Sequence, residues 1–211
     1  MKNLKIKNID RCTTLAMTKN AQSGRSMIEM LGVLAIIGVL SVGGIAGYSK
    51  AMTKYRINKT IEQITLIAGN IRTFFAPQKN YVGLGCPDVP DSDGCALVKK
   101  AHLLPDEMLT LTDGKITAVT NAFGGDFQVY QNNKGFYMRF GNIPQEVCIE
   151  LATYDWQTVG ITFVTAAAEH DGTAKVPVSM DTAIELCSAG DNLEMQFDFD
   201  IKDCSTCIMI D

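Results

Sequence analysis

The fold of this chain is decided by the stretch Gly24-Arg25-Ser26-Met27-Ile28-Glu29-Met30-Leu31-Gly32-Val33-Leu34-Ala35-Ile36-Ile37-Gly38-Val39-Leu40. It opens with a small residue and a cation, followed by a single carboxylate and an unbroken apolar run. From Met30 to Tyr48, a length of nineteen residues, no side chain is charged. At about 1.5 Å per residue, such a helix nearly spans a hydrocarbon core of roughly 30 Å. The stretch therefore predicts a membrane helix with one carboxylate, Glu29, at its edge.

The residues before this stretch are polar and basic. Residues 1–24 have a net charge of +4 in a chain whose formal net charge is −4, so the remainder is acidic. Excess Lys and Arg keep this flank in the cytoplasm, and the rest of the chain is then translocated. A signal peptide has its small-residue cleavage site after the apolar run, whereas Gly24 precedes it. An ordinary signal anchor is the plain alternative.

The acidic remainder argues against nucleic acid as a partner, because phosphate binding needs clustered Lys and Arg.

The helical pattern continues beyond Tyr48. Apolar residues recur there at spacings of three and four, and no proline occurs before Pro77. We therefore expect one helix over 25–76, roughly 75 Å long. Its part 30–48 spans the membrane and its part 49–76 packs on a soluble domain through one apolar stripe. The stripe consists of Ile57, Ile61, Ile64, Ala68, Ile71 and Phe75.

Residues 77–211 predict a globular head, so that the fold class is α+β with an antiparallel sheet. Apolar and polar residues alternate strictly over 192–201, which predicts a strand with one buried and one solvent-exposed face. The helical stripe is the natural cover for the buried face. The other expected elements are a short helix at 96–109 within a turn-rich part, a hairpin from Phe127 to Phe140, helices at 144–153 and 181–187 (capped by Ser179 or Asp181), and a strand at 159–164.

Seven cysteines are many for a chain of 211 residues. An even number beyond a membrane-type segment indicates an oxidising compartment and disulfides. A zinc site at Cys204-Ser-Thr-Cys207 is the alternative, but it would need a second such pair or a His pair. Six cysteines allow fifteen pairings, so the spacing leaves the connectivity open. The six after the apolar run are Cys86, Cys95, Cys148, Cys187, Cys204 and Cys207.

Gly24 followed by Arg25-Ser26-Met27-Ile28-Glu29-Met30-Leu31 resembles the cleavage region of type IV prepilins, and the resemblance extends over residues 24–50. In that family a membrane peptidase cuts after the glycine, the new terminus is methylated, and a glutamate at the fifth mature position guides assembly. The resemblance implies cleavage after Gly24, Arg25 as the N-methylated terminus and Glu29 as the assembly glutamate. Arg25 departs from the apolar residue expected there. The family's usual mid-segment proline is absent, and Gly43, Gly44 and Gly47 occupy that region; Gly43 and Gly47 also have the GxxxG spacing of close helix packing.

The length of the leader resembles the type IVb subclass. Cys148, in a short helix, and Cys187, just before the last clear strand, look like the type IVb pilin disulfide. We expect two further pairs beside it, Cys86–Cys95 and Cys204–Cys207.

The function implied by the resemblance is that of a structural pilus subunit. The precursor would cross the bacterial inner membrane once, be processed by prepilin peptidase, and be assembled by inner-membrane machinery into an extracellular homo-oligomeric filament for adhesion, motility or conjugation. Glu29 would pair with the terminal amine of a neighbouring copy, because a charge pair inside an apolar bundle fixes register whereas an unpaired charge is costly. No cofactor or metal is expected.

The alternatives are an enzyme, a secretion pseudopilin or minor pilin, and a monomeric signal-anchored protein. An enzyme is disfavoured because no nucleophile elbow, phosphate loop or metal triad is present, and Phe123-Gly124-Gly125-Asp126 is typical of a turn before a strand. A secretion pseudopilin or a minor pilin shares the cleavage and helix pattern. A monomeric signal-anchored protein would retain residues 1–24.

Overall fold

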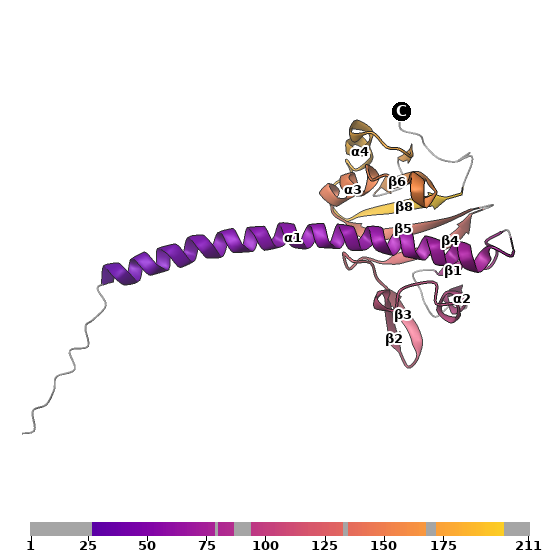
Figure 1. Ribbon diagram of the computed structural model, residues 1–211, viewed down its shortest axis with the longest axis horizontal. Coiled ribbons are helices and arrows are strands. Elements are labelled where there is room, and N and C mark those ends of the chain that lie inside the picture. The colour runs from indigo at the N-terminus through magenta and orange to yellow at the C-terminus, as the bar shows by residue number, and fades with distance from the viewer. Residues whose placement is uncertain (1–26, 79, 87–93, 133–134, 168–171, 201–211) are drawn as a thin grey trace, which may run out of the picture. The chain divides into compact units, whose positions relative to one another are not determined.

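A computed structural model of the chain describes residues 27–78, 80–86, 94–132, 135–167 and 172–200 (Figure 1). The chain divides into two compact units, Met1–Ala46 and Gly47–Asp211. Helix α1, Met27–Phe75, belongs to the first unit up to Ala46 and to the second unit from Gly47 onward.

Helix α1 has no proline anywhere along its length, so that every residue can contribute a backbone donor. It ends at Phe75, two residues before Pro77, and the Gln78 backbone amide donates to the Phe75 carbonyl at 3.0 Å. A proline disfavours the helical conformation at the residue before it, which places the end of the helix here. The expected long helix is confirmed over its described residues, and residues 25 and 26 lie outside them.

The described part of the second unit contains a six-stranded antiparallel sheet with the strand order β1-β4-β5-β8-β6-β7. Its central pairings join β8 to β5 and to β6, and its hairpin joins β4 to β5. The α+β fold with an antiparallel head is thus confirmed. The strands are β1 (Gly85–Cys86), β4 (Phe127–Asn132), β5 (Gly135–Ile143), β6 (Ile161–Ala167), β7 (Thr173–Lys175) and β8 (Leu193–Phe199).

One face of this sheet forms the core of the second unit. Phe136 stacks on Phe199 with ring centroids 4.5 Å apart, and Phe140 meets Phe197 edge to face at 5.8 Å. Figure 1 shows the second half of α1 running across the sheet, with α3 (Gln145–Ala152) and α4 (Met180–Leu186) to one side. The predicted stripe of α1 faces this core: all of its members are buried except Ile61, which is partly buried.

A separate two-stranded hairpin lies on the other side of α1 in Figure 1. It consists of β2 (Leu109–Thr112) and β3 (Lys115–Val119). Both residues of its turn, Asp113 and Gly114, have positive φ, as a tight two-residue hairpin turn requires.

The structure corrects several expected element boundaries. The helix expected at 96–109 is shorter: α2 spans Gly94–Lys100, because His102 has a φ of +49° and Pro105 interrupts helical bonding before the 3₁₀ turn Asp106–Met108. The strand expected at 159–164 begins at Ile161, since a second 3₁₀ turn, Gln157–Val159, ends at the left-handed Gly160. The helices at 145–152 and 180–186 agree with expectation, and Ser179 caps the latter by accepting from the Thr182 amide.

The outer face of β8 is less solvent-exposed than its alternation predicts. Glu194 and Gln196 are partly buried and Asp198 is only 3% exposed. The alternating polar residues are therefore held in a network on the sheet rather than immersed in water. Ile201, the last apolar residue of the expected strand, lies outside the described residues.

Candidate assembly surface

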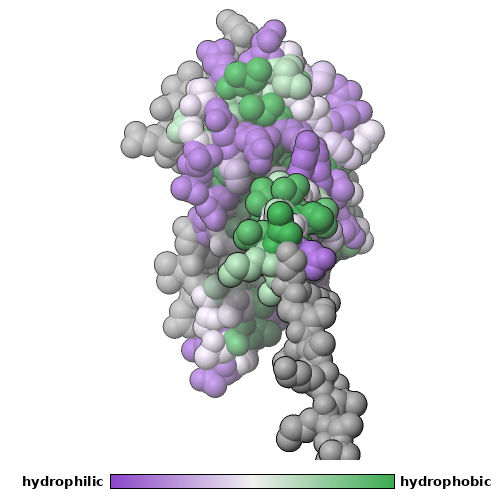
Figure 2. All heavy atoms as spheres, turned by 90° about the vertical axis from the view of Figure 1, so that its left-hand side faces the viewer, coloured by the Kyte–Doolittle hydropathy of each residue, from purple (hydrophilic) through white to green (hydrophobic). Residues whose placement is uncertain are grey.

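The first half of α1, Met27–Ala46, is exposed along its whole length; we call it the apolar half. Its large apolar side chains are between 53% and 87% exposed. In Figure 2 they form one hydrophobic mass that faces the viewer. The residues concerned are Met27, Ile28, Met30, Leu31, Val33, Leu34, Ile36, Ile37, Val39, Leu40, Val42 and Ile45.

A helix that is apolar on every side is stable when something other than water surrounds it, either lipid or other apolar helices. Among the described residues, α1 is the one helix long and apolar enough to cross a membrane, judged by length and composition. None of its most apolar window is buried within the chain. The apolar half therefore requires a partner that a single copy does not supply.

Glu29 lies in the first turn of α1. A carboxylate at this position interacts favourably with the positive end of the helix dipole, which alone gives it a structural role. Glu29 is exposed and makes no hydrogen bond or ion pair with other described residues. Gly24 and Arg25, which the sequence links to it, lie outside the described residues.

The glycines of the apolar half are not in close contact with any other element among the described residues. Apart from the adjacent residues and the helix's own backbone, a Cβ atom added at Gly32, Gly38, Gly43 or Gly44 would meet no atom of the described residues within 4 Å. Each glycine costs an isolated helix about 1 kcal/mol relative to alanine. Close approach of another helix, which small residues permit in apolar bundles, would account for that cost.

The second half of α1 contrasts with this, because polar contacts as well as its stripe hold it within the second unit. Lys54 pairs with Glu150 at 2.6 Å, and Lys59 pairs with Glu107 at 2.8 Å. The hydrogen bond from Lys59, followed by that from Gln63, holds the pKa of Glu107 below its usual value.

Arg72 fixes the last turns of α1 to the far end of β8. Its guanidinium contacts Asp200 at 3.1 Å and donates to the carbonyl oxygens of Val159 and Gly160. The Tyr81 hydroxyl also donates to Asp200, at 2.9 Å; burial and then this bond raise the pKa of Tyr81. Gly160, at φ +80°, lies against the guanidinium, so a side chain would be strained there and would also displace Arg72.

Two disulfides tie the peripheral parts of the second unit together. Cys86 in β1 is bonded to Cys95 in α2, and Cys148 in α3 is bonded to Cys187 at the end of α4. All four cysteines are buried. The remaining expected pair, Cys204 and Cys207, lies outside the described residues, as does any zinc site there. Within the described residues, no group of three or more His, Cys, Asp and Glu side chains is placed to hold a metal ion.

Arg139 lies at the centre of a network of hydrogen bonds and an ion pair on the outer face of β8. Its guanidinium pairs with Glu194 at 2.6 Å and donates to Gln196 at 3.1 Å, and Gln196 in turn donates to Asp198 at 3.0 Å. The second carboxylate oxygen of Asp198, Oδ2, is buried without a hydrogen-bond partner. Burial raises the pKa of Asp198 to about 6, against the lowering effects of Gln196 and Arg139.

The model of the family described as "PilS N terminal" matches residues 54–198, more than half of the chain. The chain belongs to the PilS family. Two curated relatives, each named as the major structural subunit of bundle-forming pilus, come from Escherichia coli O127:H6 and O111:H-. Each is 27% identical to this PilS-family chain over 146 residues, which cover 67% of the chain and 69% of the relative. The predicted type IV pilin resemblance is thereby confirmed.

Two solved structures are also similar to this PilS-family protein. One is a type IV b pilin from Salmonella typhi, with 14% identity and a TM-score of 0.47, covering 67% of this chain and 98% of that one. The other is TcpA, a type IV pilin from Vibrio cholerae El Tor biotype, with 15% identity and a TM-score of 0.44, covering 68% of this chain and 98% of that one.

The predicted site residues fall into three groups. Glu29 is placed at the start of the exposed apolar half, and four of the six expected disulfide cysteines are paired as expected. Gly24, Arg25, Cys204 and Cys207 are outside the described residues. Sequence reasoning missed the contact of Glu107 with Lys59 and Gln63, because no local pattern links a 3₁₀ turn to a helix 44 residues earlier.

Proposed function

We propose that this chain is a structural subunit of a type IV pilus of the type IVb kind, and not an enzyme. The observation that supports the proposal most strongly is the apolar half of α1, exposed on all sides in a chain of the PilS family. The relatives named as major subunits of a bundle-forming pilus favour a pilus subunit over a secretion pseudopilin.

The proposal includes the processing that the sequence predicts. Residues 1–24 form a cytoplasmic leader, prepilin peptidase cuts after Gly24, and Arg25 becomes the N-methylated terminus. Until then the precursor spans the inner membrane once, with its head in the periplasm. The assembly machinery then transfers the subunit into the extracellular filament, where other copies replace lipid around the apolar half.

The contact between copies is heterologous and does not close, so it generates an open helical filament. The terminal amine of one copy, with an unperturbed pKa near 8, pairs with Glu29 of its neighbour. In an apolar bundle an unpaired carboxylate is expensive and a paired one fixes the axial register. The filament serves adhesion, motility or conjugation.

A substitution of Glu29 tests this register role. Glu29→Ala should reduce the filaments sheared from the cell surface by at least about tenfold, since an unpaired buried charge costs several kcal/mol. The amount of the chain in the membrane should not change. Glu185→Ala, at an exposed carboxylate of α4, is the matched control and should assemble normally. Normal filament yield from Glu29→Ala would disprove the register role.

A further inference from the structure

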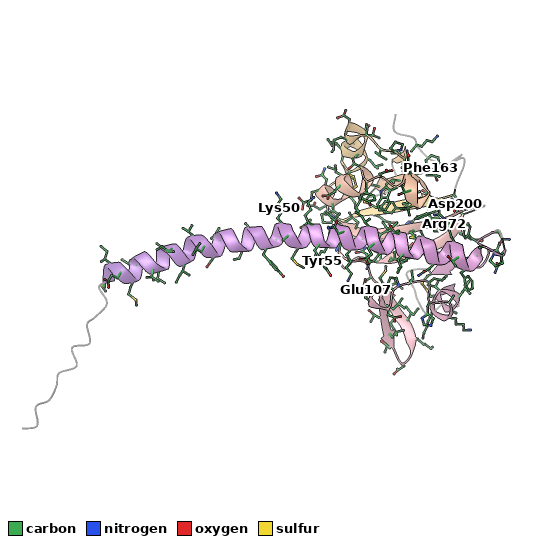
Figure 3. The ribbon with its side chains drawn as sticks, viewed as in Figure 1. Lys50, Tyr55, Arg72, Glu107, Phe163 and Asp200 are labelled. Carbon is green, nitrogen blue, oxygen red and sulfur yellow. A yellow bond between two sulfur atoms is a disulfide. The ribbon has the colours of Figure 1, made fainter. Side chains whose placement is uncertain are left out.

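A pocket of about 380 Å³ lies between the second half of α1 and the segment that precedes β2. Tyr55 and Leu66 of α1 lie along it, and Glu107 closes the other side. Figure 3 shows Tyr55 and Glu107 on the same side of α1. The pocket belongs entirely to the second unit, and none of its residues takes part in the predicted cleavage or register contact.

The polar groups of the pocket carry excess negative charge and excess acceptor capacity. Glu107 is paired with Lys59 at 2.8 Å and accepts from Gln63 at 3.0 Å. Glu62 also lines the pocket, is exposed, and makes no hydrogen bond or ion pair within the described chain. Two carboxylates thus face one ammonium group, which leaves one negative charge unmatched.

Gln63 provides a second, independent sign of a missing donor. Its side chain is 4% exposed, and its oxygen Oε1 is buried without a hydrogen-bond partner. Its amide nitrogen is already used by Glu107, so exchanging the two amide atoms would set the oxygen against a carboxylate. A buried acceptor without a partner costs about 1–3 kcal/mol.

The apolar edge of the pocket fits a long basic side chain. Tyr55 is 58% exposed and Leu66 48% exposed, although both flank charged groups. Lys and Arg place their methylene groups along apolar surface while the charged head reaches an acceptor. The face of a tyrosine ring also attracts a nearby cation.

We propose that this pocket receives a basic side chain from a second copy of the chain in the filament, with Glu62 as its main carboxylate partner. This inference rests on the proposed function, because only assembled copies provide the contact. Charge complementarity supports the occupant. Four basic side chains make no hydrogen bond or ion pair with other described residues, and they are Lys50, Arg56, Lys100 and Lys175.

Charge reversal followed by rescue tests the proposal in cells that assemble the full-length chain. Glu62→Arg should lower the yield of sheared filaments by at least about tenfold, because like charges brought together in a contact cost several kcal/mol. Combining it with Lys50→Glu, Arg56→Glu, Lys100→Glu or Lys175→Glu, one at a time, should restore the yield in one of the four double variants. Glu185→Arg on α4 is the control for the charge change alone.

The outcomes separate this inference from the proposed function. Wild-type filaments together with an unaffected Glu62→Arg variant would overturn the pocket contact and leave the pilus assignment intact. Failure of all four rescues would overturn it as well. If Glu62→Arg does not accumulate in the membrane, Glu62→Gln replaces it and should reduce the yield about threefold or more. A normal yield from Glu62→Gln would then overturn the proposal. Absence of wild-type filaments would instead disprove the proposed function.

Discussion

The two halves of α1 are one continuous helix with opposite surroundings. In the second half, a stripe at helical spacing is buried against the sheet, and ion pairs hold its flanks. In the apolar half every residue is exposed and no such contact occurs in the described chain. Both halves therefore have the same helical backbone, but different surroundings stabilise each half. The apolar stripe of the second half is buried within its own copy, whereas the apolar half requires lipid or other copies.

The largest predicted effect compares matched isoleucines in the two halves. Ile64 is fully buried and Ile36 is 62% exposed. Ile64→Ala should lower the free energy of unfolding of the second unit by about 3 kcal/mol, because it leaves a cavity in the core. Ile36→Ala should leave that free energy unchanged. Denaturant unfolding in detergent, followed through the fluorescence of Trp156, reports on the second unit alone, since this is the single tryptophan. Equal shifts for the two variants would break the comparison.

The second prediction concerns how the free energy of unfolding of the second unit depends on pH. The pKa of Asp198 is raised from 3.8 to about 6 in the folded state, so the fold binds the proton more tightly than the unfolded chain. The free energy of unfolding should therefore fall as pH rises from about 4 to about 6, by at most roughly 3 kcal/mol. Asp198→Asn should remove this slope and stabilise the second unit at pH 7.

The control for this prediction is Asp191→Asn, at an exposed residue before β8, which should leave the slope in place. Unfolding curves at a series of pH values measure both variants. An unchanged slope in Asp198→Asn would show that the buried carboxylate of the β8 network is not its source.

The smallest effect is expected from the ion pair nearest the apolar half. The side chains of Lys54 and Glu150 are 56% and 41% exposed, so water and salt screen their attraction. Lys54→Ala should cost less than about 1 kcal/mol of unfolding free energy, and the loss should shrink at high salt. A double-mutant cycle with Glu150→Ala measures the coupling. A coupling of several kcal/mol would mean that ion pairs, rather than the apolar stripe, hold the second half in place.

Sequence patterns predicted those parts of the fold whose cause is local. The spacing of Ile57, Ile64 and Ile71 requires one helical face, and the alternation from Leu193 to Phe199 requires a strand with an apolar face. Ser179 could be placed as a cap because it precedes a short helix. Glu29 and the membrane-type run could be recognised from the sequence because this one carboxylate directly precedes nineteen uncharged residues.

The features that escaped prediction depend on residues distant in sequence. The short strands β1 and β7 exist because longer strands offer them an edge, and they have too few residues for a pattern of their own. The burial of Asp198 could not be seen in a strand whose alternation is regular. The pocket beside Glu107 forms only when a 3₁₀ turn meets α1. Its residues have no shared motif, and only the fold brings them together.

We propose that the apolar half leaves the membrane to become the interior of a filament after cleavage at Gly24. The intact mass of the chain in filaments sheared from the cell surface tests this most directly. We expect the filaments to contain this chain with residues 1–24 removed, beginning at an N-methylated Arg25. Recovery of the chain only from the membrane, with residues 1–24 still attached, would contradict it.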